Sequence, residues 1–134
     1  MIPSTLLRTG AGEALQAAGL APLREIEGLG VYEGPPVQAA FPCAIVEAGP
    51  ESDWSHKSGE GREVRLAVVL HDRGERPVRL KALMGAAEAA LAAIGEVPGW
   101  QLVTLRFMRS RLARDAKGEW AGSIEYRARM MRAD

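Results

Sequence analysis

The middle of the chain carries the clearest alternation of apolar and polar residues. Between residues 62 and 71, valine and leucine occupy every second position, and Glu63, Arg65 and Ala67 stand between them. Because successive side chains of a strand point to opposite faces, this pattern predicts a strand with one buried face. The residues expected on that face are Val64, Leu66, Val68 and Leu70.

The C-terminal part of the chain predicts two more strands. A hairpin turn signal at residues 115–118 separates a segment at about 100–112 from a final alternating segment at 120–131. We expect both segments to pair through that turn, each with one apolar face. The residues expected to point inward are Val103, Leu105 and Phe107 in the first segment, and Trp120, Ile124, Tyr126, Ala128 and Met130 in the second.

Helical spacing of apolar residues occurs in two places. From Pro77 to about Ile94, leucine and alanine recur every three or four positions, and Gly95 follows as a stop signal. A weaker pattern predicts a first helix from Ser4, which can cap it, to Ala18, with Gly19 as its end. Two internal glycines weaken that first helix, since each costs about 1 kcal/mol relative to alanine.

The segment between the first helix and the long strand is rich in proline and glycine. Residues 20–40 predict an ordered connector that holds at most a short strand at residues 30–32. Pro42 then begins a strand at residues 43–47, because proline is tolerated at the first position of a strand. A polar loop at residues 49–61 leads from that strand to the next.

These elements predict an α+β fold. We expect a single domain over residues 1–134, with a mainly antiparallel sheet of about four strands and two helices packed on one face. A chain of this length buries a core without help from metals or disulfides. The single cysteine, Cys43, cannot form an internal disulfide, and we expect it to act as a small apolar residue on a buried strand.

The charges balance overall but are unevenly distributed. Seventeen basic and seventeen acidic residues give no net charge that would steer the chain toward nucleic acid or anionic lipid. From residue 100 onward, however, eight basic residues stand against four acidic ones. Separated charges suit the head-to-side association that a ring requires. Arginines covering apolar neighbours on a solvated sheet face are the alternative explanation.

The ends and the apolar runs of the sequence bear on location. The start lacks the basic and apolar regions of a signal peptide, and no apolar run approaches the roughly 20 residues that cross a bilayer. We therefore expect no membrane partner. The single cysteine, in turn, predicts a chain adapted to a reducing cytoplasm, or at least indifferent to redox state.

The residue types of a hydrolase triad occur together only in the polar loop. Asp53, Ser55 and His56 lie within four positions of one another, whereas triad members converge from different parts of a fold. His56 and His71, the only histidines, have no histidine or cysteine at zinc-ligand spacing. The sequence therefore predicts no enzymatic activity, no cofactor and no metal site.

The same loop holds a tryptophan, Trp54. A side chain of this size has no packing reason to lie in a polar, glycine-rich loop unless the loop folds back on the body or meets a partner. Two interpretations stay open: Trp54 packs over its own loop, or it anchors a partner or adjacent protomer. The candidate interface residues of this loop are Asp53, Trp54, Ser55, His56 and Lys57.

A group of arginines marks the far end of the strand at 100–112. Its members are Arg106, Arg109, Arg111 and Arg114. In a straight strand, Arg109 and Arg111 share the side of Leu105 and Phe107, while Arg106 points to the opposite side. We therefore expect the strand to leave the core after Phe107 and to project a basic patch beyond the sheet. Contacts with a neighbouring subunit are favoured over contacts with DNA phosphates. No aromatic series for stacking bases accompanies the arginines, so sequence-specific binding of nucleic acid is not expected. Simple solvation is the third alternative.

Several short motifs follow one another from about residue 31 to the last strand. They are Val31-Tyr32, Pro35-Pro36, Phe41-Pro42, Asp53-Trp54-Ser55, Gly61 before the long strand, the alanine-rich helix, and Leu105-Arg106-Phe107. None is specific alone. Their order and spacing resemble the tail completion, or tail terminator, proteins of long-tailed phages, especially those in the gene transfer agents of alphaproteobacteria.

The resemblance implies a structural protein that forms a ring, typically hexameric, on the head-proximal end of a finished tail tube. Such a ring ends tube polymerisation and forms the head–tail joining surface, and it carries no cofactor. The implied partners are other copies in a homo-hexameric ring, the tail tube protein, the head-completion or connector protein, and DNA passing transiently through the ring. The implied location is the bacterial cytoplasm during assembly and then the tail of a phage-like particle.

Two other classes of protein stay open. One is another morphogenesis part, either a head-completion protein or a tail-tube subunit. The other is a small ligand-binding domain or enzyme with a pocket that the sequence does not reveal.

Overall fold

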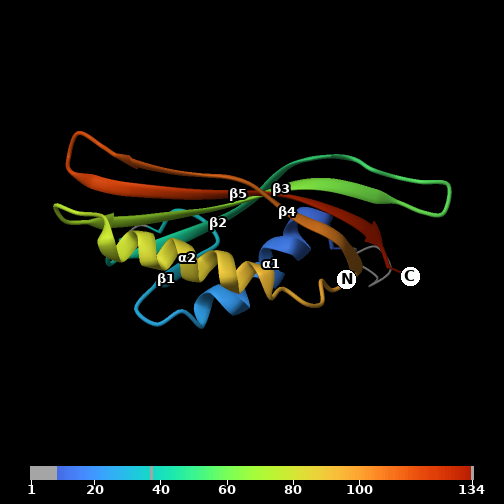
Figure 1. Cartoon of the computed structure of the whole chain (residues 1–134). Helices are drawn as coiled ribbons and strands as arrows, with labels where there is room; N and C mark the ends of the chain where they lie inside the picture. The colour runs from blue at the N-terminus through green and yellow to red at the C-terminus, as the bar shows by residue number, and fades with distance from the viewer. Residues whose placement is uncertain (1–8, 37, 134) are drawn as a thin grey trace.

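The computed structural model of the protein describes residues 9–36 and 38–133, which form a sheet with two helices against one face (Figure 1). In chain order the elements are α1 (Ala11–Arg24), β1 (Gly30–Tyr32), β2 (Cys43–Asp53), β3 (Gly61–Arg73), α2 (Val78–Ala92), β4 (Trp100–Arg114) and β5 (Glu119–Arg132). The strand order is β1-β2-β3-β5-β4. β1 is parallel to β2, and the other neighbours are antiparallel. The α+β class is confirmed, and the sheet is a mixed one of five strands rather than about four antiparallel ones.

The core lies between the sheet and the helices. The alternation predicted for β3 and β5 is confirmed, because the apolar residues of one face are buried in both strands. The fully buried residues of these strands are Val64, Leu66, Val68, Leu70, Ile124, Ala128 and Met130. Leu15 and Leu23 of α1 and Leu80 and Leu91 of α2 close this face from the other side.

α2 confirms the predicted second helix and lies very close to the sheet. The point of closest approach is Gly122 of β5, where a Cβ atom would stand 2.4 Å from the Met84 sulfur. With any larger residue at this position, the Met84 side chain would have to move. The small residues of α2 and β5 therefore set how closely the helix and sheet layers pack.

α1 lies later in the chain than the sequence predicts. It begins after Gly10 and continues through Gly19 to Arg24, with Pro22 inside its last turn. The expected cap, Ser4, lies outside the described residues. Gly19 does not end the helix because it is buried toward α2, where a Cβ would lie 3.6 Å from a Leu91 methyl group. The tertiary contact outweighs the local stop signal.

The predicted loop at 49–61 is largely strand. β2 continues to Asp53 and β3 begins at Gly61, so only the tip of a long hairpin remains as a loop. β2 shifts its register against β3 between Ala48 and Glu51. This irregularity lets the strand continue through Gly49-Pro50, which the sequence suggested was a break.

Two bulges interrupt β4, between Leu102 and Thr104 and between Phe107 and Arg109. Val103 does not pack inward as predicted, and Phe107 lies on the predicted side, opposite Tyr126, but is not buried, since both side chains are exposed. Val103 lies in the first bulge, and Phe107 stands edge-on to Tyr126, with 5.9 Å between ring centroids. Leu105 packs half-buried against the core, as predicted.

The irregularity of β2 and the second bulge of β4 fall on one line across the sheet. Ala48 pairs with Leu66, Leu66 with Tyr126, and Tyr126 with Phe107. Bulges increase the local twist of a sheet. In Figure 1 the strands cross at the middle, and the β2–β3 and β4–β5 hairpins extend from there to opposite ends.

Candidate functional site

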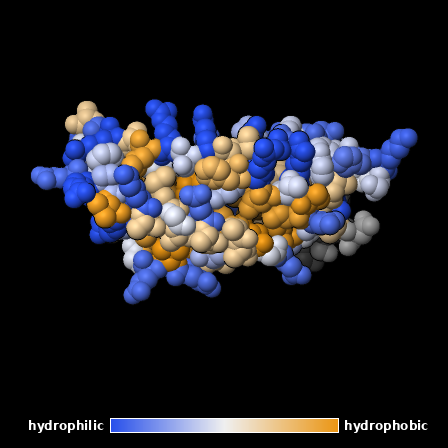
Figure 2. Space-filling model, in the orientation of Figure 1, coloured by the Kyte–Doolittle hydropathy of each residue, from blue (hydrophilic) through white to orange (hydrophobic). Residues whose placement is uncertain are grey.

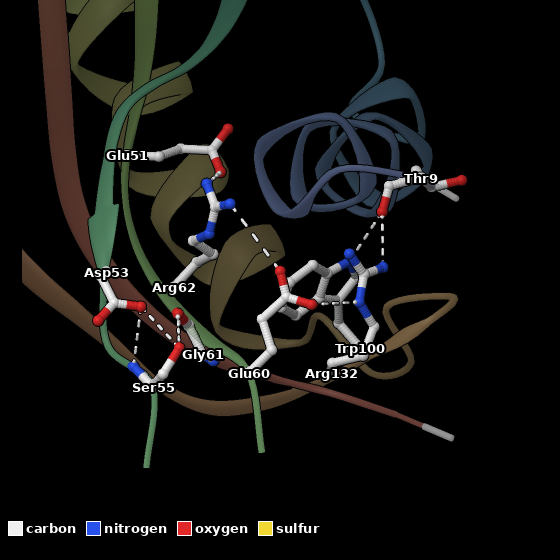
Figure 3. Close-up of polar contacts among 9 residues, drawn as sticks. All are labelled: Thr9, Glu51, Asp53, Ser55, Glu60, Gly61, Arg62, Trp100 and Arg132. Atoms are coloured by element: carbon white, nitrogen blue, oxygen red, sulfur yellow. Dashed lines mark hydrogen bonds and ion pairs between the residues drawn. The ribbon is translucent and has the colours of Figure 1, made fainter. Parts of the chain in front are cut away.

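The tip of the β2–β3 hairpin is held by a compact set of hydrogen bonds. The Ser55 hydroxyl donates to Asp53 Oδ1 at 2.6 Å and accepts from the Gly61 backbone N–H at 3.1 Å (Figure 3). A Cβ on Gly61 would stand 2.2 Å from the Trp54 carbonyl oxygen, so this position requires glycine. The Ser55 hydrogen bond lowers the pKa of the Asp53 carboxyl group. Asp53 and Ser55 therefore serve as turn-forming residues.

Trp54 lies half-buried beside this turn. The guanidinium carbon of Arg129 is 5.6 Å from the centre of a Trp54 ring, and His56 meets that side chain edge-on at 4.5 Å. The Trp54 backbone N–H donates to the Gly61 carbonyl oxygen at 2.9 Å. Intramolecular packing thus accounts for part of the Trp54 surface, and the rest is open to solvent. Lys57, at the tip itself, is exposed.

Most arginines of β4 share the face of the sheet that points away from the helices, which we call the open face. Arg106 pairs with Arg127, Arg109 with Glu125 and Arg111 with Ser123, and these β5 partners alternate with its buried residues. A straight strand would put Arg106 on the side opposite to Arg109 and Arg111. That prediction is wrong, because the bulge between Phe107 and Arg109 adds one residue and shifts the later side chains.

Three arginines line up directly across the open face, and we call them the arginine row. Arg65 of β3 pairs in register with Arg127 of β5, which pairs with Arg106 of β4. The Arg127 Nε atom is buried without a hydrogen-bond acceptor among the described residues. Like charges directly opposite one another destabilise a sheet. The arginine row therefore lowers the stability of the isolated chain locally.

Acidic residues flank the arginine row on both sides. Glu63 Oε1 lies 3.2 Å from Arg129 Nε and 3.8 Å from Arg127 Nε, and Glu125 pairs with Arg109. Hydrophilic side chains stand out along the upper side of Figure 2, which is the sheet side, while hydrophobic surface gathers below them. The open face is thus a charged surface in which several arginines already have partners.

A shallow hollow of about 520 Å³ crosses the open face along the line of irregularities. Charged residues from all four long strands contribute to its lining, as do both irregular segments. The lining residues are Glu47, Gly49, Pro50, Arg65, Leu66, Ala67, Met108, Arg109, Glu125 and Tyr126. Burial, together with Glu88, raises the pKa of Tyr126 to about 12, so its hydroxyl stays protonated at neutral pH.

Arg114, the last arginine of β4, has an intramolecular role. Its guanidinium lies over Trp120, 5.1 Å from the ring centre, and donates to the Gly74 and Gly118 carbonyl oxygens at 3.4 and 3.3 Å. The Trp120 indole N–H also donates to the Gly74 carbonyl oxygen, at 2.9 Å. Arg114 therefore ties the β4–β5 hairpin to the turn before α2.

A second polar cluster ties the chain ends to the β2–β3 hairpin (Figure 3). The Thr9 carbonyl oxygen accepts hydrogen bonds from the Trp100 indole at 3.1 Å and from Arg132 at 3.0 Å. Arg132 also lies over Trp100 at 4.0 Å and donates to Glu60 at 3.2 Å. No sequence pattern predicts this cluster, since its members are far apart in the chain and no spacing connects them.

The structure does not bring the two predicted interface groups together. The Trp54 turn lies at one end of the sheet, where Gly61 pairs with Met131, and Arg114 lies at the other end, opposite Trp120. Arg106 lies in between. Arg65 and Arg127 are not among the interface residues that the sequence predicts. The alternation placed Arg65 opposite the buried residues, but only the strand register aligns it with Arg127.

One further titratable group, the Cys43 thiol, is buried. Burial, with Glu119 and Asp72 nearby, raises the pKa of the Cys43 thiol. Within residues 9–36 and 38–133, no three His, Cys, Asp or Glu side chains gather so as to hold a metal ion. Neither described helix is long and apolar enough to span a bilayer.

Comparisons with known proteins cover nearly the whole chain. The model of the family described as Tail completion protein gp17 matches residues 10–131. Among solved structures, the chain is similar to one in the virion of a native gene transfer agent (GTA) particle, with a TM-score of 0.66 and 26% identity. That similarity covers 92% of this chain and 99% of the other. No curated protein matches the sequence.

Proposed function

The chain belongs to the tail completion protein gp17 family, and on that premise we propose that it closes the head-proximal end of a tail tube in a phage-like particle. Copies of the chain form a ring, six in the hexamer that the sequence resemblance implies. The ring ends polymerisation of the tube and presents the joining surface to the head. DNA passes through its centre.

The extent of the likeness to the gene transfer agent particle chain carries this proposal. The match leaves almost nothing of either chain uncovered. A likeness that extends over nearly all of a chain in a particle supports a role as a particle subunit.

The shape of the fold supports a subunit with several neighbours. Two long hairpins reach to opposite ends of the molecule, and the open face between them is charged (Figures 1 and 2). In the proposed ring, the Trp54 turn and the β4 arginines contact adjacent copies, the tube protein below or the head-completion protein above. The proposed role is structural, and the Ser55 hydroxyl forms the turn with Asp53 and Gly61.

Electron microscopy of particles from a host that lacks the gene tests this function. We expect overlong tails, or tails without heads beside DNA-filled heads, because nothing stops or joins the tube. Normal particles would overturn the proposal. Tails of normal length that fail to join would instead identify a head-completion role, and tubes formed by the purified protein alone would identify a tube subunit.

A further inference from the structure

The two edges of the sheet carry opposite charge. β4, the edge strand on one side, contains four arginines and no acidic residue. β1, the edge strand on the other side, follows the exposed Glu25 and Glu27 and precedes the exposed Glu33. Residues 25–33 include no basic residue. A single copy therefore has a basic edge and an acidic edge, separated by the width of the sheet.

The basic edge combines free charge with exposed apolar surface. Arg106 and Arg111 have no ion-pair partner in the described part of the chain, whereas Arg109 is paired with Glu125. The exposed apolar side chains of this edge are Val103 (43%), Phe107 (45%) and Met108 (40%). Aromatic, methionine and arginine side chains are the types enriched at protein interfaces. β4 also presents an unpaired backbone edge along its whole length.

The acidic edge has the complementary character. Its three glutamates have no ion-pair partner within residues 9–36 and 38–133. The nearest basic residue in sequence, Arg24, donates hydrogen bonds to the Val31 carbonyl oxygen at 3.3 and 3.4 Å, so its guanidinium is turned toward β1. Ile26 and Tyr32 lie between the glutamates and are half-exposed. This edge thus offers both carboxylates and apolar contact area.

A protein edge suits these arginines better than a nucleic acid does. DNA presents a continuous line of phosphates. Glu63 and Glu125 lie on the same face, two residues along their strands from Arg65 and Arg127 and on opposite sides of the arginine row, and would repel such a line. Discrete carboxylates can meet the free arginines without approaching those glutamates. The two edges of one chain cannot meet each other, so the complementary charges can pair only between copies.

We propose that the β4 edge of each copy docks against the β1 edge of the next copy in the ring. This inference rests on the proposed function, which supplies the ring, and it names the surfaces that form it. The contact is heterologous, because each copy uses one edge to each side, and such a contact closes into a ring when the rotation fits. The apolar residues provide the contact area, and the charges fix partner and register.

Two charge-reversal variants test the contact in a host that lacks the gene. The first carries Arg106→Glu and Arg111→Glu, and the second carries Glu25→Arg and Glu27→Arg. Each variant alone would bring like charges together at every contact, so we expect about tenfold or greater loss of head-joined tails of normal length. Produced together, the two variants restore opposite charges at every contact when they alternate. An even-membered ring such as a hexamer allows this alternation, and we expect normal tails to return.

Matched controls place the same charge changes away from both edges. Arg76→Glu lies in the turn between β3 and α2, and Glu13→Arg lies in the first turn of α1. Both should give normal tails. Circular dichroism of each purified variant checks folding, and the single reversals Arg111→Glu and Glu27→Arg replace any double variant that fails to fold.

Normal tails from either edge variant alone would overturn the proposed contact. So would a mixture of two folded variants that fails to restore what each has lost. The deletion strain separates this result from the function itself. Normal particles without the gene remove the terminator role, whereas abnormal tails without the gene and normal tails with both variants remove only the edge contact.

Discussion

The two faces of the sheet are built from the same strands but are fixed by different constraints. On the face under the helices, side chains of β3 and β5 alternate into a fully buried apolar layer. On the open face the intervening positions carry arginine and glutamate in pairs and rows. A buried face fixes the register of its strands, since a slip by one residue would expose the whole layer. The open face has no such constraint.

The irregularities of the sheet follow this difference. The central pair, β3 and β5, is continuous over thirteen residue pairs, and the register shifts occur in β2 and β4. Each central strand is held by neighbours on both sides and by a helix layer. β4 is an edge strand, so a bulge costs it fewer interactions. The charged pattern of the open face is therefore set by bulges as much as by sequence alternation.

Neighbouring substitutions in β3 give the largest contrast between the faces. Leu66→Ala removes a fully buried side chain and should lower the free energy of unfolding by about 2–5 kcal/mol. Arg65→Ala, one residue earlier on the open face, should change it by about 0.5 kcal/mol or less. Urea unfolding of both variants measures the difference. Similar losses would mean that the open face is as tightly packed as the covered one.

The next largest expected effect on the free energy of unfolding comes from replacing Asp72, the one charged residue that is buried among the described residues. Asp72 is 3% exposed at the helix-covered end of β3 and accepts two hydrogen bonds from Arg79, at 2.8 and 2.6 Å. These bonds, and one from the Arg73 backbone N–H, hold the pKa of Asp72 below its usual 3.8. Because 61% of the Arg79 side chain is exposed, solvent screens the pair. We expect Asp72→Asn to cost about 1–2 kcal/mol of stability at pH 7.

The pH dependence of that cost follows from the lowered pKa. The folded state favours the carboxylate, so the stabilisation is complete above the unfolded-state pKa and declines as pH falls below about 4 through the folded-state pKa. Urea unfolding at pH 7 and pH 3 should therefore show a smaller gap between wild type and Asp72→Asn at the lower pH. A gap that does not shrink would indicate that packing, and not charge, sets the effect.

The sequence predicts the covered face much better than the open one. Val64, Leu66 and the apolar residues of β5 were assigned to the core by alternation alone, and the second helix by its leucine spacing. Both predictions follow from burial, which selects residue type at each position. The first helix was misplaced because Gly19 is buried against α2, a contact that local stop signals do not reveal.

The candidate site depends on features that alternation cannot give. The prediction for the side of Arg109 and Arg111 is wrong because a bulge lies between Phe107 and Arg109, and no residue type in the sequence indicates that bulge. The arginine row joins three strands, so it requires the register of β3, β5 and β4 together. A tryptophan in a polar, glycine-rich segment draws attention to the Asp53-Trp54-Ser55 motif. Its role in forming a turn follows only from the hydrogen bonds to Gly61.

Trp54 lies at the tip of the β2–β3 hairpin, at one end of the sheet. Replacing it distinguishes a role in folding from a role in assembly. Trp54→Ala loses the contacts with Arg129 and His56, which should cost about 1 kcal/mol of stability. The protein stays folded. If the exposed part of Trp54 anchors a partner, head-joined tails should fall well beyond what this loss explains. Arg129→Met, which removes one of the same internal contacts and lies outside the candidate interface residues, is the matched control.

Tail assembly is scored by electron microscopy, and the free energy of unfolding is measured with urea, for the same two variants. Normal tails from folded Trp54→Ala protein would restrict the tryptophan to its turn. Loss of tails in both variants in proportion to their stability would give the same conclusion. Only a selective loss in Trp54→Ala supports an interface at the hairpin tip.

Replacing Arg127, at the centre of the open face, has the smallest expected effect on the free energy of unfolding. Its expected sign is opposite to that of the core substitutions. Its Nε atom is buried without an acceptor, its contact with Glu63 spans 3.8 Å, and it lies between Arg65 and Arg106. Arg127→Met removes the unpaired donor and the like-charge contacts but keeps an apolar side chain of similar length. Glu63 retains Arg129 at 3.2 Å. We expect the free energy of unfolding to stay unchanged or rise by about 1 kcal/mol.

Arg129→Met is the informative counterpart, since it removes a paired arginine from the same strand and face. It loses both the Glu63 ion pair and the Trp54 contact, and should lower stability by about 0.5–1 kcal/mol. Urea unfolding at low and high salt compares the two variants. A loss from Arg127→Met as large as that from Arg129→Met would show that the arginine row stabilises the free chain. A neutral or stabilising result would mean that the row is retained for something other than the stability of the free chain, as a partner-binding surface would be.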